Sequence, residues 1–401
     1  MPQIPRLKPY SGPALFSYGF RPFFLLGSTY AGLEVLAWLP MYYGELSLGT
    51  AFAPRDWHAH EMLFGYVAAV IAGFLLTAIP NWTGRLPLQG LPLVVLVATW
   101  LSGRVAVDLS AKIGWLSAAV VDVAFLVLMA GALSREIVVG KNWRNLKVVG
   151  VIAFLAIANI AFHLEAHFTG GAIYSTRFGI GLVIFLIMAV GGRIVPSFTR
   201  NWLMRREAGR LPAPFDRLDA GCMVVSALAL VFWALEPEGL LTAIALVTGA
   251  VVNALRLARW AGERTIADRL VLILHVGFAF VAIGFALSAF AALGLAPPSA
   301  GIHAWTTGAI GLMTLAVMSR ASLGHAGRAL TAAPSLQAIY AMAAVAAITR
   351  IAAALLPEAG GILLHLAAFA WAIAFLGFSL LYAPLLCRPK RPSPSKRRPT
   401  V

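Results

Sequence analysis

Long apolar stretches of the chain alternate with short segments that contain charged residues, Pro or Gly. A helix needs about 20 residues to cross the ~30 Å hydrocarbon core of a bilayer. The candidate stretches cover residues 22–43, 58–80, 90–109, 112–133, 146–168, 176–198, 218–235, 239–257, 268–294, 301–320, 335–356 and 360–385. Runs such as Val67–Ile79 stay apolar throughout, whereas the strands of a membrane barrel alternate. The pattern therefore predicts an all-α, polytopic membrane helix bundle of about 12 transmembrane helices.

The composition agrees with a protein that lies almost entirely in the bilayer. Hydrophobic residues make up 60% of the chain and charged residues 12%, where a soluble domain has about one quarter charged residues. Two Cys among 401 residues exclude a disulfide scaffold or a Cys-rich metal protein. We expect an N-terminal cytoplasmic segment over 1–21, one transmembrane bundle over 22–385 and a basic, disordered cytoplasmic tail over 386–401.

The net charge of +15 indicates a topology rather than a nucleic-acid partner. Twelve crossings place both termini on one side, and cytoplasmic loops of membrane proteins carry an excess of Lys and Arg. With cytoplasmic termini, few of the 31 basic residues fall in outer loops or outer helix ends, namely Arg55, Arg104, Lys112, Arg177 and Arg350. The basic excess recurs at every inner loop. We therefore predict a multi-pass protein with both termini in the cytoplasm and no nucleic-acid binding.

Histidine is the most informative polar residue in the predicted spans, because polar groups in the membrane are costly and often functional. Six of the eight His project to one depth near the outer helix ends: His58, His60, His163, His167, His303 and His365. Imidazole is a frequent ligand of copper, haem iron and zinc. The shared depth favours an outer metal site, although a lone interfacial His more often bonds to headgroups. His58 and His60 diverge in a continuous helix, so they converge only if the helix begins between them.

The remaining polar residues allow more than one interpretation. His275 lies about 10 Å from the inner start of its helix and is a candidate axial haem ligand. Glu34 and Asp122 fall inside predicted helices, where a proton path or a buried ion pair would explain them, and Glu61 follows His60. Arg193, Arg320 and Arg350 have a structural role or, in a haem protein, pair with propionates. We find no Walker A, dinucleotide or nucleophile-elbow motif.

Several long strings, in order, resemble the NnrS family of bacterial membrane proteins over residues 15–385. They are Phe20-Arg21-Pro22-Phe23-Phe24, Trp57-His58-Ala59-His60-Glu61-Met62-Leu63-Phe64-Gly65, Pro80-Asn81-Trp82-Thr83-Gly84-Arg85, Gly192-Arg193-Ile194-Val195-Pro196-Ser197-Phe198-Thr199-Arg200-Asn201, His303-Ala304-Trp305-Thr306-Thr307-Gly308 and Arg320-Ala321-Ser322-Leu323-Gly324-His325-Ala326-Gly327-Arg328. Where the family pattern has Gly-His-Thr-Gly-Arg, this chain has Ala326 in place of the Thr.

The resemblance implies a haem- and copper-containing protein of the bacterial inner membrane, produced with denitrification or nitric-oxide defence and relieving nitrosative stress. The matching strings contain His58, His60, His303 and His325; His163 and His275 also fit the family pattern, whereas His167 and His365 are not carried over. On this basis we expect copper to bind at His58, His60 and His303, supported by His163. We expect a haem of b-type to bind at His275, together with His325.

Two function classes follow. The first is a metalloprotein that binds nitric oxide or, as a nitric-oxide-reductase-like enzyme, reduces it to N2O with an unidentified electron donor. An outer copper and an inner haem would lie up to ~20 Å apart. Either the haem sits in the outer cluster too, or the centres exchange electrons. The second class is a secondary transporter, favoured by Gly191-Gly192 and Pro196, which interrupt the sixth helix. A copper-handling protein without gas chemistry is a third interpretation.

Overall fold

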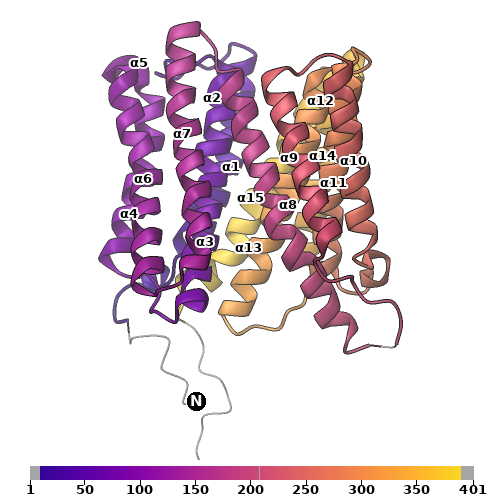
Figure 1. The fold of residues 1–401 in the computed structure, drawn as a ribbon. Helices are drawn as coiled ribbons and strands as arrows, with labels where there is room; N and C mark the ends of the chain where they lie inside the picture. The colour runs from indigo at the N-terminus through magenta and orange to yellow at the C-terminus, as the bar shows by residue number, and fades with distance from the viewer. Residues whose placement is uncertain (1–9, 207, 390–401) are drawn as a thin grey trace, which may run out of the picture.

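The computed structural model describes residues 10–206 and 208–389. Residues 1–9 of the predicted N-terminal segment and residues 390–401 of the predicted tail lie outside the described residues. Figure 1 shows an all-helical bundle, and the described part contains 12 helices long and apolar enough to cross a membrane. This confirms the predicted fold class. That the termini are cytoplasmic rests on the charge distribution and stays a prediction.

Ten spans are single helices: α1 (Phe20–Tyr42), α4 (Leu91–Asp108), α6 (Trp115–Val139), α7 (Leu146–Thr169), α8 (Tyr174–Leu203), α9 (Arg217–Leu235), α10 (Leu240–Ala258), α11 (Arg269–Ala292), α14 (Pro334–Leu355) and α15 (Gly360–Cys387). Short elements lie between them: η1 (Ala14–Ser17), α5 (Ser110–Ile113), η3 (Trp143–Asn145), η4 (Gly262–Thr265) and η6 (Pro357–Ala359).

The other two spans each consist of three segments. One runs through α2 (Pro54–His60), the π-helical η2 (Glu61–Val67) and α3 (Ala68–Thr83). The other runs through α12 (Pro298–His303), the π-helical η5 (Ala304–Ile310) and α13 (Gly311–His325). Both begin with Pro in the first turn, where the missing N–H has no helical partner anyway. In both, the π-helical segment follows directly after a His, and such segments are frequent at functional sites.

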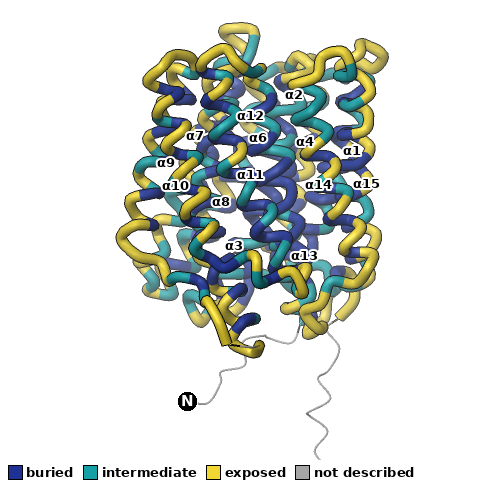
Figure 2. The backbone as a smooth tube through the Cα atoms, turned by 90° about the vertical axis from the view of Figure 1, so that its right-hand side faces the viewer, coloured by how far each residue is buried: buried dark blue, intermediate teal, exposed yellow. Residues whose placement is uncertain are grey.

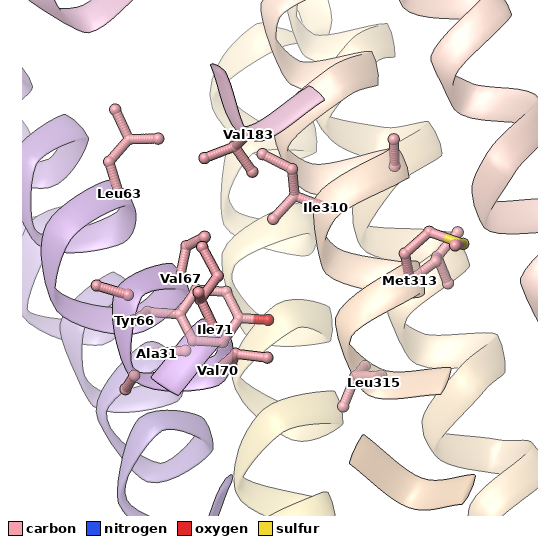
Figure 3. Packing of buried hydrophobic residues seen from close by; sticks show 14 of the residues in the cluster. Ala31, Leu63, Tyr66, Val67, Val70, Ile71, Val183, Ile310, Met313 and Leu315 are labelled. Carbon is pink, nitrogen blue, oxygen red and sulfur yellow. The ribbon is translucent and has the colours of Figure 1, made fainter. Parts of the chain in front are cut away.

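These two interrupted spans form the centre of the bundle. In the most apolar 18-residue stretch of each span, 83% and 67% of the residues are buried, the highest shares among the 12 spans. Figure 2 shows the buried backbone in the middle of the molecule and exposed helices around it. In Figure 3 the side chain of Val67 faces that of Ile310, and the Tyr66 hydroxyl forms a hydrogen bond with Thr314 Oγ1. The two interrupted spans therefore lie in the most buried part of the bundle.

The beginning and the end of the described chain lie at the same face of the bundle. The Arg21 guanidinium donates to the carbonyl oxygens of Leu386, at 2.8 Å, and Arg388, at 2.7 Å. We call this end the termini face and the opposite end the far face. The short helices α2 and α12 begin at the far face, near the top of Figure 1. The predicted outer side therefore corresponds to the far face.

Candidate functional site

A cavity of about 970 Å³ extends from the far face into the bundle. Its volume is at the upper end of the range for small-molecule and cofactor sites, about 300–1,000 Å³. Residues of α1, α2, η2, α8, α12, η5, α14 and α15 line it. The aromatic rings of Trp38, Tyr66 and Trp371 contribute to its walls, and Arg350 lies among the lining residues. The two interrupted spans therefore enclose a large, mostly apolar space with a few polar groups.

His58 and His303 both line this cavity, one from α2 and the other from α12. His58 Nδ1 lies 2.7 Å from Glu34 Oε1, and its ring stacks on Trp38 with 4.5 Å between the ring centroids. His303 Nδ1 lies 2.7 Å from the carbonyl oxygen of Ser299. Since a carbonyl only accepts, His303 Nδ1–H donates and its Nε2 keeps a lone pair.

The same holds for His58 when Glu34 is ionised, because the carboxylate then accepts from Nδ1–H. The Nε2 atom of neither ring has a hydrogen-bond partner among the described residues. Metal-ligating His residues usually donate their second ring nitrogen to a carboxylate or a carbonyl. Both imidazoles of the cavity have this arrangement.

A second group of polar residues is fully enclosed between α2, α6 and α7. The Nε2 atoms of His60 and His163 lie 3.2 Å and 3.1 Å from the same oxygen, Asp122 Oδ2. The potential ligand atoms of these three buried residues lie within 4.8 Å of one another. Asn159 Nδ2 donates to the same carboxylate oxygen at 2.7 Å. This His60–Asp122–His163 cluster is the one group of three or more His, Cys, Asp or Glu side chains with metal-site spacing in the described chain.

A buried ion-pair network holds the cluster in place. The guanidinium of Arg104 contacts Asp122 Oδ1 and lies 2.6 Å from Glu61 Oε2. Glu61 Oε1 in turn lies 2.8 Å from His60 Nδ1, and Tyr30 donates its hydroxyl to Glu61. All the charged groups of this network are at most 4% exposed. Their mutual bonds compensate the cost of placing two carboxylates inside a membrane bundle.

The family model described as NnrS protein matches residues 14–390. The chain belongs to the NnrS family. The resemblance of the sequence strings is thereby confirmed, and it supports in general terms a membrane protein of the nitric-oxide response. No curated protein matches the chain.

In this NnrS protein, the four outer His of the predicted copper site lie in two pairs. His58 and His303 line the cavity, while His60 and His163 share the carboxylate of Asp122. The predicted second span starts at residue 58, whereas the observed span starts at Pro54. Both His58 and His60 are therefore inside a helix, where residues two apart point in different directions.

The predicted haem ligands of this protein lie elsewhere. His275 Nε2 is 2.8 Å from Thr199 Oγ1, and its Nδ1 is buried with no partner. His325 ends α13 at the termini face and packs against the rings of Tyr18 and Phe20, each at 5.4 Å. Neither His lines the cavity.

The three predicted propionate-binding arginines have different surroundings. Arg350 lines the cavity and has no ion-pair partner among the described residues. Arg320 lies over the Phe198 ring, 4.1 Å from its centroid, and Arg193 is exposed on α8. Of the three, Arg350 alone is placed to meet an anionic group in the cavity.

Sequence reasoning missed Arg104 and Asn159 as members of the site. Arg104 was assigned to an outer helix end, although it lies within an apolar stretch. Asn159 stands four residues before His163 in an otherwise apolar run, so both side chains project from one helix face. This four-residue spacing could have identified Asn159 as a neighbour of His163 from the sequence alone. His167 and His365, which were left out, are exposed, and His167 stacks on Trp115.

Proposed function

We propose that this NnrS-family protein is a haem- and copper-containing protein of the bacterial inner membrane that binds nitric oxide and so relieves nitrosative stress. The observation that carries the proposal is the cavity between α2 and α12, where two imidazoles from different spans each have Nδ1 engaged and Nε2 available. A bound haem would supply an iron that coordinates nitric oxide. The residues of the chain would orient the haem and exclude water.

The lining of the cavity fits a haem of b-type in size and in chemistry. A volume of about 970 Å³ accommodates a cofactor, and aromatic rings favour an apolar macrocycle. His58 and His303 are the imidazoles that would hold the haem in the cavity. The guanidinium of Arg350 matches a propionate, because Arg binds carboxylates with two parallel hydrogen bonds. The proposed haem would lie in the predicted outer cluster, one of the alternatives that the sequence leaves open.

Copper fits the His60–Asp122–His163 cluster. Imidazole suits copper, and ligand atoms about 3.1–3.2 Å apart are close to the spacing expected around one ion with bonds of about 2.0–2.2 Å. Asp122 contributes the carboxylate, and Asn159 and Glu61 fix the donor atoms from outside. The assignment of haem to His275, whose Nε2 lies 2.8 Å from Thr199 Oγ1, stays a prediction.

The absorption spectrum and metal content of single variants test both assignments. We expect His58→Ala and His303→Ala to lose the Soret band and His163→Ala to lose copper while keeping haem. His365→Ala, which removes an exposed imidazole of similar depth, is the matched control and keeps both. Haem retained in His58→Ala and His303→Ala but lost in His275→Ala would contradict the cavity assignment.

Addition of nitric oxide to the reduced protein then tests ligand binding. A shift of the Soret band supports binding, and N2O measured in the gas phase with an added electron donor would extend the function to reduction. A colourless, metal-free wild-type protein would contradict the proposal and favour the transporter. Copper without a Soret band would favour a copper-handling protein without gas chemistry.

A further inference from the structure

Glu34 is a buried carboxylate with one partner. Its side chain is 0% exposed, and Oε1 lies 2.7 Å from His58 Nδ1. The other oxygen, Oε2, is buried without a hydrogen bond. No Lys or Arg of the described chain is within ion-pair distance of it. A carboxylate in a membrane helix is costly, so a residue with so little compensation is a candidate for function.

The two imidazoles that line the cavity differ in the group that accepts the hydrogen bond from Nδ1–H. For His58 the acceptor is the carboxylate of Glu34, and for His303 it is the neutral backbone carbonyl of Ser299. A carboxylate draws the Nδ1 proton toward itself and makes Nε2 of the same ring more basic. The ring of His58 is also fixed in its plane by stacking on Trp38, with an interplanar angle of 26°. His58 is therefore the more strongly electron-donating of the two rings.

We propose that Glu34 is a positioning residue that acts through His58 to lower the reduction potential of a haem bound in the cavity. This inference rests on the proposed function, since it needs a haem that His58 would hold in the cavity. Stronger donation from an axial ligand stabilises the oxidised iron, and hydrogen bonding to the ligand is one of the means by which a protein sets this potential. Orienting His58 alone would not require a charge, so the proposal is distinct from a structural role.

The test is a redox titration of the purified haem-containing protein, followed by the Soret band. Glu34→Gln keeps an acceptor of the same size beside Nδ1 but removes the charge. We expect this variant to retain haem and to shift the reduced-to-oxidised ratio at a fixed potential about tenfold toward the reduced form, an upward shift of about 59 mV for one electron.

Glu165→Gln is the matched control. Glu165 is a carboxylate near the same face, and it accepts from the backbone N–H groups of Ile173 and Tyr174 at 2.9 Å and 2.8 Å without lining the cavity. Its variant loses the same charge, and we expect its potential to equal that of the wild type. A potential shift of the same size in both variants would overturn the inference, because it would be a general effect of net charge.

The outcomes separate this inference from the proposed function. Wild-type protein without haem contradicts the proposed function itself. Haem that depends on His58, with a Glu34→Gln potential equal to wild type, overturns only the role of Glu34. If Glu34→Gln yields no haem-containing protein, Glu34→Asp, which keeps the charge, is titrated in its place. Haem loading with a reduced-to-oxidised ratio within about twofold of wild type then supports the role of the charge. Loss of haem from Glu34→Asp as well overturns it.

Discussion

Arg104 is the residue on which the buried cluster depends for its charge balance. It is the cation that contacts both Glu61 and Asp122, and all three side chains are at most 4% exposed. Arg104→Met keeps much of the side-chain length but leaves two buried carboxylates without their arginine. Breaking a buried ion pair by removing one partner costs about 3–5 kcal/mol. The folded-to-unfolded ratio is therefore expected to fall by at least about a hundredfold, since about 1.4 kcal/mol corresponds to tenfold.

Denaturation of the detergent-solubilised protein, followed by tryptophan fluorescence, measures this loss. Arg135→Met is the control, because the Arg135 side chain is 73% exposed and its pair with Glu136 spans 3.9 Å. Such surface pairs contribute about 0–1 kcal/mol. The triple variant Glu61→Gln, Arg104→Met, Asp122→Asn removes all three charges together and should recover much of the stability. Equal stability of Arg104→Met and Arg135→Met would refute the reasoning.

Three further predictions address packing, a helix cap and topology. Gly284→Ala should destabilise the bundle by about 1–3 kcal/mol in the same assay, because the added Cβ would overlap the indole of Trp305. Gly131→Ala is the control, because its added Cβ meets open space. A hydrogen bond from a neighbouring arginine lowers the pKa of Asp216 from 3.8 to about 2. Asp216 is the N-cap of α9, where its carboxylate accepts from the backbone N–H groups of Leu218 and Asp219. The stabilisation by this N-cap is present above about pH 4 and is lost as the pH falls toward 2. The stability difference between wild type and Asp216→Asn should therefore stay constant from pH 5 to 8 and shrink below about pH 4, and a difference that grows on acidification would contradict this. Cys387 is exposed at the termini face and Cys222 is buried. A membrane-impermeant maleimide should label Cys387 in inside-out membrane vesicles but not in right-side-out vesicles. Labelling only in right-side-out vesicles would place the termini on the outer side.

The sequence was sufficient to predict the number of spans. The length of an apolar stretch depends on that stretch alone and not on how the helices pack. The predicted third span, 90–109, and the observed α4, Leu91–Asp108, agree closely. The second span was predicted to begin at residue 58 and begins at Pro54 instead. Arg55 and Asp56 resembled a loop, yet Pro in the first turn and a buried Asp56 extend the helix. The prediction therefore missed the first turn of α2, because that turn contains charged residues.

The pairing of the polar side chains could not be predicted in the same way. Depth along the membrane placed His58, His60, His163 and His303 at one level, but depth says nothing about rotation around a helix axis. Asp122 was expected to be a buried polar group, and its partners are supplied by three other spans. Which residues meet depends on how the helices pack, and that is a tertiary property.

The directions in which the side chains of α2 project explain how one short helix contributes to both proposed centres. At about 100° per residue, side chains two positions apart point roughly 200° away from each other. His58 therefore lines the cavity, while His60 points into the cluster with His163. An outer copper and a haem at His275 would be separated by much of the membrane. A haem at His58 and a copper at His60 would instead be joined through Ala59 and a single turn of helix. A movement of α2 would then shift ligands of both proposed centres at once.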